Sequence, residues 1–482
     1  MDKNKMFSRR DTLKFGAMAI AVSAVGFSGL TFSSNKRSAV VIGSGIAGLS
    51  AAYELKKAGF DVVVMEKWDF VGGRMRDAKI GPFQLMPHAL GVLQDTHEIH
   101  SLAKEVGIAD QFSGEADADL YYMNNGVGTY PISLKFDASQ VAQIPGMSKE
   151  TIARLPLLQK ELDEIRKKVD PSLMASGAYL DNETVAQYFT RVLGPDAANQ
   201  FMDYWVDPFL DAWGLTRNES SSVPVIAWMA HGQGTKTPRG GIGVLTRKLG
   251  ELIPVQFRTT VRYITPPDKD GKHTVHYLNS NLEKKSVTPD VVVCATEGKF
   301  IPELVQGLSE KQSRLFKSID FTKSISVRFA LSPDGAPKEL VGDAYTQTHP
   351  DPTKRKIWFW YAAPQGYDHK DNPAYISVVM QRSENGNWQR SGLSQPDYCL
   401  KFLREVYPDL DESKITSAVT LGCDDLVHMQ PGYIKNMAEV LDEQNSSKHG
   451  LYFAGEYLAG GHTAAACASG RTTARTIISH WS

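Results

Sequence analysis

The sequence predicts an α/β fold in which a Rossmann-type domain is interwoven with an α+β domain made of a mixed sheet and a helical lid. Two observations lead to this prediction. From residue 38 to residue 67, a β-branched apolar run, a helix pattern and a second apolar run follow one another, as in a parallel strand–helix–strand unit. The chain has 482 residues, and because single hydrophobic cores stop growing near about 250–300 residues, we expect two joined domains.

Composition places the chain among globular proteins and excludes several functions. Hydrophobic residues make up 42% and charged residues 22% of the sequence. The formal net charge of −1 provides no basic field for nucleic acid. The four cysteines are scattered and form no CxxC pair. A zinc site or a thioredoxin-like site is therefore not expected, and no other spacing indicates a metal.

Residues 1–35 have the layout of an export signal. Basic side chains precede a Gly/Ala/Val-rich apolar run that begins at Phe15. The segment SRRDTLK, which contains Arg9 and Arg10, resembles the twin-arginine signal, with Thr12 where a phenylalanine is usual. We therefore expect delivery to the periplasm by the twin-arginine export machinery. An uncleaved membrane anchor and an ordinary basic N-terminus are the alternatives.

Three glycines lie at the turn between the first predicted strand and the helix. Gly43 permits the tight turn, Gly45 lets the backbone approach a pyrophosphate, and Gly48 lets the helix pack closely on the strand. The backbone N–H groups of Ile46 and Ala47 would face the anion at the positive end of the helix. This arrangement, with a strand before it and a helix after it, predicts a dinucleotide site.

An acidic residue and a second glycine pair indicate which dinucleotide binds. Glu66 ends the second predicted strand, where a carboxylate can accept hydrogen bonds from both ribose hydroxyls and would repel a 2′-phosphate. NADP is therefore disfavoured. Gly72, Gly73 and Arg74 follow, and a nicotinamide domain has no need of this second turn. A longer cofactor does, because its diphosphate and ribityl chain run back past such a loop.

The order GxGxxG, Glu, GGR resembles the flavin-containing amine oxidase superfamily, which includes monoamine oxidases, protoporphyrinogen oxidases and phytoene desaturases. The resemblance extends from about residue 38 to the C-terminus. It includes the segments TPRGGIGVLTRKLGELI and, near the C-terminus, GLYFAGEYLAGGHTAAACASG. Residues 183–215 resemble the lid helices of the protoporphyrinogen oxidase-like branch.

The resemblance implies FAD as the cofactor and assigns residues to it. The backbone at Val261 would face the adenine, and Glu456 would serve the diphosphate–ribityl region. The N–H groups near Thr463 would face the flavin O2 edge, where a helix dipole stabilises the anionic reduced flavin. The expected FAD-binding residues are Gly43, Gly45, Ile46, Ala47, Gly48, Glu66, Lys67, Gly73, Arg74, Val261, Gly455, Glu456 and Thr463.

The two domains are expected to alternate along the chain. The FAD-binding domain would comprise residues 36–112, 233–320 and 424–482. The substrate-binding domain would comprise residues 113–232 and 321–423, with a helical segment at 148–232 and a hairpin that turns at Asn124–Gly126.

Several positions depart from the family pattern in a gap-free register. Met86 and His88 stand where the family has an acid and a glycine in front of the flavin, and His88 is either a flavin or substrate ligand or a packed structural histidine. His462 occupies one position of the aromatic cage of amine oxidases. The other position carries no aromatic residue, so Tyr433 or Tyr457 would have to replace it.

A further departure concerns the lysine that many amine oxidases hold near flavin N5. Ser324 stands in that register, and Lys323 is adjacent but points the other way on a strand. These departures disfavour a simple primary-amine oxidase and favour the protoporphyrinogen oxidase or desaturase branch. By position alone, the catalytic candidates are His462, His88 and Tyr433.

We therefore expect an exported FAD-dependent oxidoreductase that transfers hydride from a small amine or apolar C–C substrate to flavin N5. Oxygen, a quinone or a redox carrier would reoxidise the flavin. A desaturase of the protoporphyrinogen or polyene type, an FAD-dependent isomerase and a non-catalytic FAD-bound scaffold are the alternatives. Substrate identity and oligomeric state are left open by the sequence.

Overall fold

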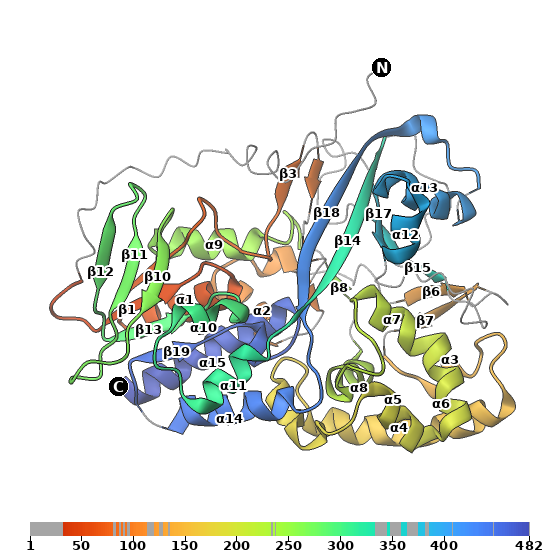
Figure 1. The fold of residues 1–482 in the computed structure, drawn as a ribbon, viewed down its shortest axis with the longest axis horizontal. Coiled ribbons are helices and arrows are strands. Elements are labelled where there is room, and N and C mark those ends of the chain that lie inside the picture. Colours follow the sequence, from red (N-terminus) through yellow and green to blue (C-terminus); the bar gives the residue numbers. More distant parts are fainter. Residues whose placement is uncertain are drawn as a thin grey trace.

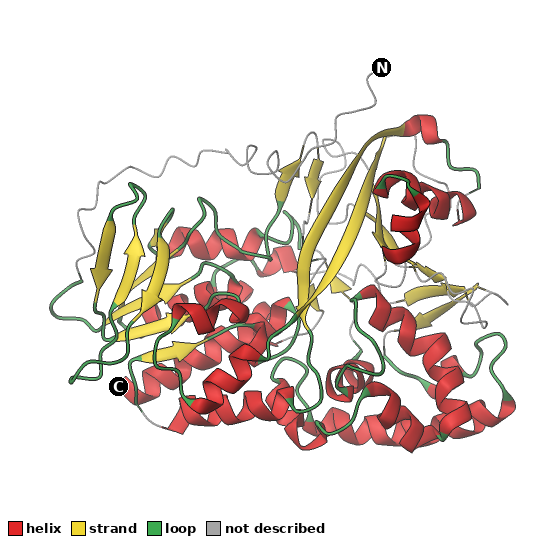
Figure 2. Ribbon diagram, viewed as in Figure 1, coloured by secondary structure: helices red, strands yellow, loops and turns green. Residues whose placement is uncertain are grey.

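The computed structural model of the chain describes residues 32–80, 83–85, 88–89, 92–93, 97–112, 120–124, 129–133, 135–232, 235–236, 238–332, 345–347, 358–363, 375–380, 385–406, 408–446 and 448–481. Nearly all of the predicted export signal, and Met86, lie outside these residues. The fold is α/β, as predicted. A parallel-sheet domain lies at one end, two long strands cross the middle, and a helical layer lies at the other end (Figures 1 and 2).

The first domain is built on a five-stranded parallel sheet. Val40 of the central strand pairs with Val63 on one side and with Val292 on the other. The central strand is buried along its whole length, which is why its sequence is a continuous apolar run. In spatial order the strands are β19 (Leu451–Phe453), β13 (Val291–Cys294), β1 (Ser38–Ile42), β2 (Asp61–Met65) and β9 (Val255–Gln256).

Helices from distant parts of the chain cover this sheet. The first and the last helix of the domain pack directly on each other, because Gly470 has no side chain that would separate them. A Cβ at Gly470 would lie 2.1 Å from the carbonyl oxygen of Ala47. The helices are α1 (Ile46–Lys57), α2 (His97–Glu105), α9 (Val244–Leu252), α10 (Ile301–Leu304), α11 (Glu310–Lys317), α14 (Tyr433–Ser446) and α15 (Thr463–Trp481).

Smaller sheets accompany the first domain. A three-stranded antiparallel sheet consists of β10 (Thr260–Ile264), β11 (Val275–Leu278) and β12 (Lys284–Val287). Two short pairs connect neighbouring segments: β3 (Ala78–Ile80) with β4 (Phe83–Leu85), and β5 (Val92–Leu93) with β8 (Thr235–Lys236).

The second domain contains a seven-stranded mixed sheet. All pairings are antiparallel except that of β15 with β6. β18 runs through the predicted domain boundary at 423/424. In the predicted turn at Asn124–Gly126, Asn124 is the last residue of β6, and residues 125–126 lie outside the described residues. In spatial order the strands are β18 (Ile415–Val427), β14 (Phe321–Leu331), β17 (Tyr375–Met380), β16 (Trp358–Ala363), β15 (Tyr345–Gln347), β6 (Leu120–Asn124) and β7 (Thr129–Ser133).

Two groups of helices complete the second domain. One face of β14 and β17 packs against α13 (Gln395–Val406), which follows α12 (Asn385–Ser391). The predicted helical segment forms the other group, and a π-helical turn at 202–206 interrupts it. Its helices are α3 (Ala138–Val141), α4 (Lys149–Lys168), α5 (Val185–Leu193), α6 (Pro195–Phe201), α7 (Asp207–Ala212) and α8 (Ser222–His231).

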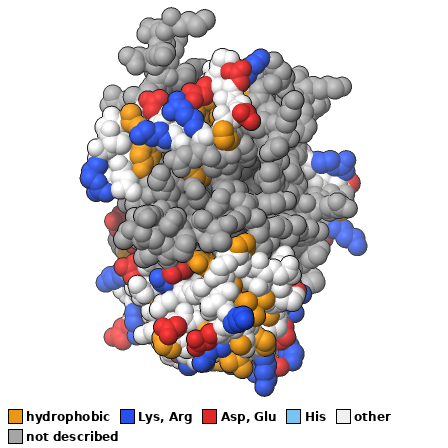
Figure 3. All heavy atoms as spheres, turned by 90° about the vertical axis from the view of Figure 1, so that its right-hand side faces the viewer, with side chains coloured by type: hydrophobic (Ala, Val, Ile, Leu, Met, Phe, Trp, Pro, Cys, Tyr) orange, Lys and Arg blue, Asp and Glu red, His pale blue; other side chains and the backbone are white. Residues whose placement is uncertain are grey.

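Two surface properties follow from the structure. Among the described residues, no helix combines the length and the apolar character that crossing a membrane requires. On the face that carries the helical segment at 148–232, acidic and basic side chains are scattered among apolar ones (Figure 3). Among the described residues on this face, acidic and basic side chains are thus interspersed rather than grouped by sign.

Candidate functional site

The N-terminus of α1 has the features of an anion site. Gly45 is its N-cap residue, no side chain caps the helix, and the first turn contains no acidic residue. The first N–H groups of a helix have no partner within the helix, and here they include those of Ile46 and Ala47. A Cβ added at Gly45 would meet no atom of the described residues within 4 Å. The positive end of α1 therefore faces open space in which an anion fits.

The neighbouring glycines have a different task. Gly43 has a φ of 102°, and a Cβ there would lie 2.8 Å from the carbonyl oxygen of Ala295. A Cβ at Gly48 would lie 2.0 Å from the carbonyl oxygen of Gly43. Gly43 and Gly48 are thus required by the fold itself. Gly45 is not, which leaves a ligand as the reason for its missing side chain.

The second glycine turn lies directly on the first. The N–H of Gly72 donates to the carbonyl of Ser44 at 2.8 Å, and Gly45 and Gly72 form an isolated parallel bridge. Gly73 has a φ of 55°, and a Cβ there would approach the Cα of Gly45 to 3.4 Å. The two predicted cofactor loops therefore form one continuous backbone surface.

Glu66 is buried at the end of β2 and is oriented by the glycine loop. Its Oε2 accepts hydrogen bonds from the N–H of Ser44 (2.9 Å) and from the Ser44 hydroxyl (2.7 Å). Its Oε1 accepts from the N–H of Trp68 at 2.9 Å. Carboxylate oxygens have about four lone-pair sites in all, so capacity for a ribose hydroxyl remains. Ser44 is a site residue beyond those predicted, although its place between Gly43 and Gly45 was a usable signal.

Residues 256–261 lie beside Glu66. The N–H of Glu66 donates to the carbonyl of Gln256 at 3.0 Å, and the N–H of Thr259 donates to the carbonyl of Glu66 at 2.8 Å. Val261 follows in β10, opposite Tyr277. The Lys67 ammonium lies 5.3 Å from the ring centroid of Trp68. The structure thus groups Glu66, Lys67 and Val261 at one end of the predicted cofactor site.

Arg74 and Glu456 form an ion pair across the domain. The Arg74 guanidinium also lies over the ring of Phe321, 5.4 Å from its centroid. The N–H of Gly455 donates to the hydroxyl of Ser469 in α15 at 3.0 Å. The loop of Gly72–Arg74 and the segment Gly455–Glu456 are therefore in direct contact, as a shared diphosphate–ribityl site requires.

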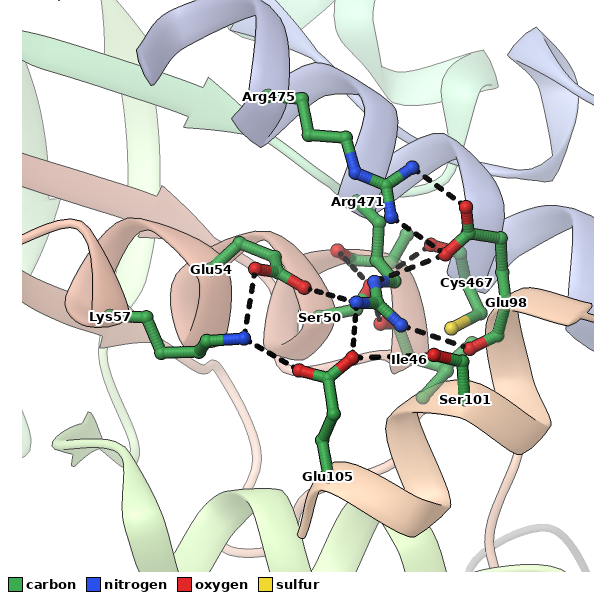
Figure 4. A network of polar contacts seen from close by, with 11 residues as sticks. Ile46, Ser50, Glu54, Lys57, Glu98, Ser101, Glu105, Cys467, Arg471 and Arg475 are labelled. Atoms are coloured by element: carbon green, nitrogen blue, oxygen red, sulfur yellow. Dashed lines mark hydrogen bonds and ion pairs between the residues drawn. The ribbon is translucent and has the colours of Figure 1, made fainter. Parts of the chain in front are cut away.

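A buried ion network fixes α1 relative to α15 (Figure 4). Arg471, whose side chain is 5% exposed, contacts Glu54 of α1 at 2.6 Å. It also contacts two carboxylates of α2, Glu98 at 3.1 Å and Glu105 at 2.6 Å. Arg475 makes a further contact with Glu98 at 2.7 Å. The two helices whose N-termini carry predicted cofactor contacts are thus joined through charge, a feature that the sequence analysis missed.

His462 caps the helix that begins at Thr463. Its Nδ1 accepts a hydrogen bond from the N–H of Ala465 at 3.2 Å, and its Nε2 lies 2.9 Å from the carbonyl oxygen of Pro171, to which it must donate. Burial lowers the pKa of His462, which agrees with a neutral ring. Both ring nitrogens are engaged, so this geometry favours a positioning role over proton transfer.

Tyr433 and Tyr457 belong to the hydrophobic core. The Tyr433 hydroxyl donates to the carbonyl of Tyr457 at 2.9 Å, and the Tyr457 hydroxyl donates to the carbonyl of Ala454 at 3.1 Å. Burial raises the pKa of both hydroxyls. A protonated, hydrogen-bonded phenol in the core is a structural group, and this placement does not favour either ring as the missing wall of an aromatic cage.

His88 is the catalytic candidate with hydrogen-bonding capacity to spare. Its Nδ1 is buried and has no hydrogen-bond partner in the part of the chain that the structure describes. Burial, followed by the positive charges of Arg76, Arg74 and Arg328, lowers its pKa to about 4. His88 is therefore a neutral hydrogen-bonding group at physiological pH, and its catalytic role stays a prediction.

The structure gives no side-chain contacts for the two positions that were compared with the N5 lysine of the family. The side chains of Lys323 and Ser324 lie outside the described residues, so the replacement of the N5 lysine is not visible. Over the described ranges, no group of histidine, cysteine or acidic side chains could hold a metal ion.

Comparison with known proteins identifies the family. The family described as flavin-containing amine oxidoreductase matches residues 46–478, which is most of the chain. A 1-hydroxycarotenoid 3,4-desaturase of Flavobacterium sp. (strain P99-3) is 27% identical over 54% of this chain and 56% of its own length. An L-amino-acid oxidase of Sistrurus catenatus edwardsii is 27% identical over 62% of this chain and 58% of its own length. The chain therefore spans less than two thirds of these curated relatives.

Solved structures agree on the fold. A double mutant of putrescine oxidase superposes with a TM-score of 0.69 at 17% identity, covering 92% of this chain and 99% of that protein. At this identity the likeness shows the fold alone. Together with the open N-terminus of α1 and the Arg74–Glu456 contact, these findings confirm the predicted family and cofactor. The chain belongs to the flavin-containing amine oxidoreductase family, whose characteristic cofactor is FAD.

Proposed function

We propose that this chain is an FAD-dependent oxidoreductase that removes hydride from a C–H bond of a small organic substrate. When bound, FAD supplies the hydride acceptor at flavin N5. The observation that carries the proposal is the open, uncapped N-terminus of α1 beside Gly45, which a pyrophosphate fits. Ser44 orients Glu66 for a ribose, and the Arg74–Glu456 pair closes the opposite side of the same loop.

The chain's own residues have little acid–base chemistry to perform in such a reaction. Their task is to hold substrate against the cofactor, to exclude water and to orient the reacting bond. His88, neutral and with a buried nitrogen available, is the described side chain best suited to orient a substrate by hydrogen bonding. His462 would act indirectly, by fixing the N-terminus of α15.

The substrate bond is either a carbon–nitrogen or a carbon–carbon single bond. Oxidation of an amine has support from the L-amino-acid oxidase relative, and desaturation has support from the carotenoid desaturase relative. Of these two reactions, we favour carbon–carbon dehydrogenation over amine oxidation. Tyr433 and Tyr457 are hydrogen-bonded core residues rather than walls of an amine cage.

Reduction of the cofactor by substrate tests this function. Protein purified after growth with ample riboflavin should contain FAD, and its visible absorption should bleach anaerobically with at least one of a panel of amines, amino acids, porphyrinogens and polyenes. Hydrogen peroxide in air would identify oxygen as the acceptor, and its absence would favour a quinone or a carrier protein. A colourless protein that takes up no FAD would refute the proposal. An FAD-loaded protein that none of these compounds reduces would favour an isomerase or a non-catalytic scaffold.

We also propose export through the twin-arginine route, on the strength of the segment around Arg9 and Arg10. Arg9→Lys combined with Arg10→Lys should leave precursor in the cytoplasm, as measured by cell fractionation. Lys36→Gln with Arg37→Gln, downstream of the signal, provides the control. Normal periplasmic delivery of the twin-lysine variant would contradict the export proposal.

A further inference from the structure

The inner face of β14 and β17, which lies opposite α13, carries polar side chains that are buried. Along β14, Val327, Phe329 and Leu331 pack in the apolar cluster that includes α13. Side chains alternate along a strand, so Arg328 lies on the opposite face. Arg328 is 4% exposed, and Ser377, its direct neighbour on β17, is fully buried.

Buried polar atoms of this region have hydrogen-bonding capacity that the described protein does not use. Neither the Ser377 hydroxyl nor the His88 Nδ1 has a hydrogen-bond partner within the described residues. Leaving a buried polar group unsatisfied costs about 1–3 kcal/mol, and native proteins rarely tolerate it without a reason. Two such groups close to one buried guanidinium indicate a binding site for a polar ligand group.

The electrostatics of the region give the sign of that ligand group. Burial lowers the pKa of His88 most, and the guanidiniums of Arg76, Arg74 and Arg328 lower it further. Arg74 is paired with Glu456, and Arg76 lies over the ring of Phe70, 4.4 Å from its centroid. Among the described residues, the charges that act on His88 are thus positive, and they would repel a simple cationic amine while attracting an anion.

We propose that the substrate carries a carboxylate, and that Arg328 receives it, with the Ser377 hydroxyl and His88 as neighbouring hydrogen-bond donors. This proposal rests on the oxidoreductase function above and specifies its substrate class. A guanidinium presents two parallel N–H groups to a carboxylate, and this charge-assisted pair is strongest in a buried site. The anion would also occupy the unused hydrogen-bonding capacity of Ser377 and His88.

Carboxylate binding to the FAD-loaded protein tests the proposal without requiring turnover. Holoenzyme is titrated with phenylacetate and with decanoate, each compared with its neutral amide, and binding is followed by perturbation of the flavin spectrum. We expect each bound acid to bind at least about tenfold more tightly than its amide, a difference of about 1.4 kcal/mol. Arg328→Met should abolish this preference, and Arg328→Lys should retain part of it.

Two further variants keep the test decisive. Arg404→Met removes a half-exposed arginine of α13, which covers the other face of the same sheet, and should leave the preference unchanged. Ser377→Ala should weaken acid binding several-fold, and it carries the test if Arg328→Met does not fold.

The outcomes separate this proposal from the one on which it rests. FAD-loaded wild-type protein that binds neither acid, or that binds acids and amides equally, overturns the carboxylate proposal and leaves the oxidoreductase intact. An unchanged preference in both Arg328→Lys and Ser377→Ala also overturns it. Protein that cannot be loaded with FAD overturns the oxidoreductase itself.

Discussion

Two buried polar regions of this protein are built in opposite ways. In the network between α1, α2 and α15, Arg471 contacts three carboxylates, Glu54, Glu98 and Glu105 (Figure 4). Near the inner face of the sheet, the charges of described residues that act on His88 are guanidiniums, and its Nδ1 has no partner within the same part of the chain.

The difference separates charge that serves the fold from charge that serves a ligand. A buried ion is tolerated when opposite charges surround it, and the network around Arg471 meets that condition within the protein. In the region around His88, the His88 Nδ1 and the Ser377 hydroxyl have no hydrogen-bond partner among the described residues, so we infer that a ligand completes it. If this distinction is right, changes in the first region should affect mainly stability, and changes in the second should affect mainly binding.

The largest effect is expected for Arg471→Met. This change leaves three carboxylates close together without their central cation, and breaking a buried ion pair from one side costs about 3–5 kcal/mol. The midpoint of urea unfolding should fall accordingly, at fixed pH and fixed FAD concentration. Because Arg471 joins the two helices that carry predicted cofactor contacts, FAD should also be lost more readily.

Arg475→Met is the matched control, because Arg475 contacts Glu98 in the same network but is 51% exposed. Exposed pairs contribute about 0–1 kcal/mol. Similar unfolding midpoints for the two variants would show that the Arg471 network is not the structural element we take it to be.

The glycine loop allows the same comparison within one turn of chain. Gly48→Ala should destabilise the protein by about 2–3 kcal/mol, because its Cβ would lie 2.0 Å from the carbonyl of Gly43. Gly45→Ala should leave the apoprotein's unfolding midpoint unchanged, since its Cβ meets nothing within 4 Å. It should, however, reduce the stabilisation that added FAD provides. Normal FAD affinity of the Gly45→Ala protein would contradict the proposal that the pyrophosphate binds at this position.

Glu66→Gln should weaken FAD binding by about tenfold, or about 1.4 kcal/mol, because an amide accepts hydrogen bonds through one oxygen only. Glutamine keeps the size of the side chain, so the contacts with Ser44 and Trp68 are perturbed less than by alanine. Flavin retained after gel filtration measures the effect. Glu251→Gln, on the exposed end of α9, is the control. Equal retention in both variants would contradict the ribose role of Glu66.

The sequence predicted the parts of this structure that depend on local pattern. The buried β1 run, the glycines at 43, 45 and 48 and the acid at 66 lie within one strand–helix–strand unit, where spacing determines geometry. The later blocks at Val261 and Gly455 were identified through family resemblance. The structure places both in the same domain as the glycine loop.

The remaining features depend on contacts between distant segments. Pro171, which accepts a hydrogen bond from His462, lies in the segment between α4 and α5, so no local signal shows that both ring nitrogens of His462 are engaged. The alternation in SISVRFAL predicts a strand with one polar face, and a polar face is normally taken as exposed to solvent. Only the packing of the second domain shows that Arg328 is buried. Its significance could not be predicted from the sequence.

The smallest expected effect concerns the pH dependence that His88 contributes to stability. Its pKa in the folded protein is about 4, below the ordinary histidine value of 6.5. The unfolded chain therefore takes up a proton first as pH falls, so stability is lost below about pH 6.5 and the loss levels off near about pH 4. Between about pH 7.5 and about pH 5.5, His88 should account for roughly 1 kcal/mol of this loss.

Comparison of wild-type protein with His88→Asn isolates that contribution from the other groups that titrate. The loss of stability between the two pH values should be smaller in the variant, as measured by the urea midpoint. Saturating phenylacetate should also reduce the loss in the wild type, because a bound carboxylate would raise the pKa of His88 toward its ordinary value. Identical pH dependence of wild type and variant would mean that burial and the guanidiniums do not lower the pKa of His88 as the structure indicates, and the contrast between the two polar regions would then have lost its electrostatic basis.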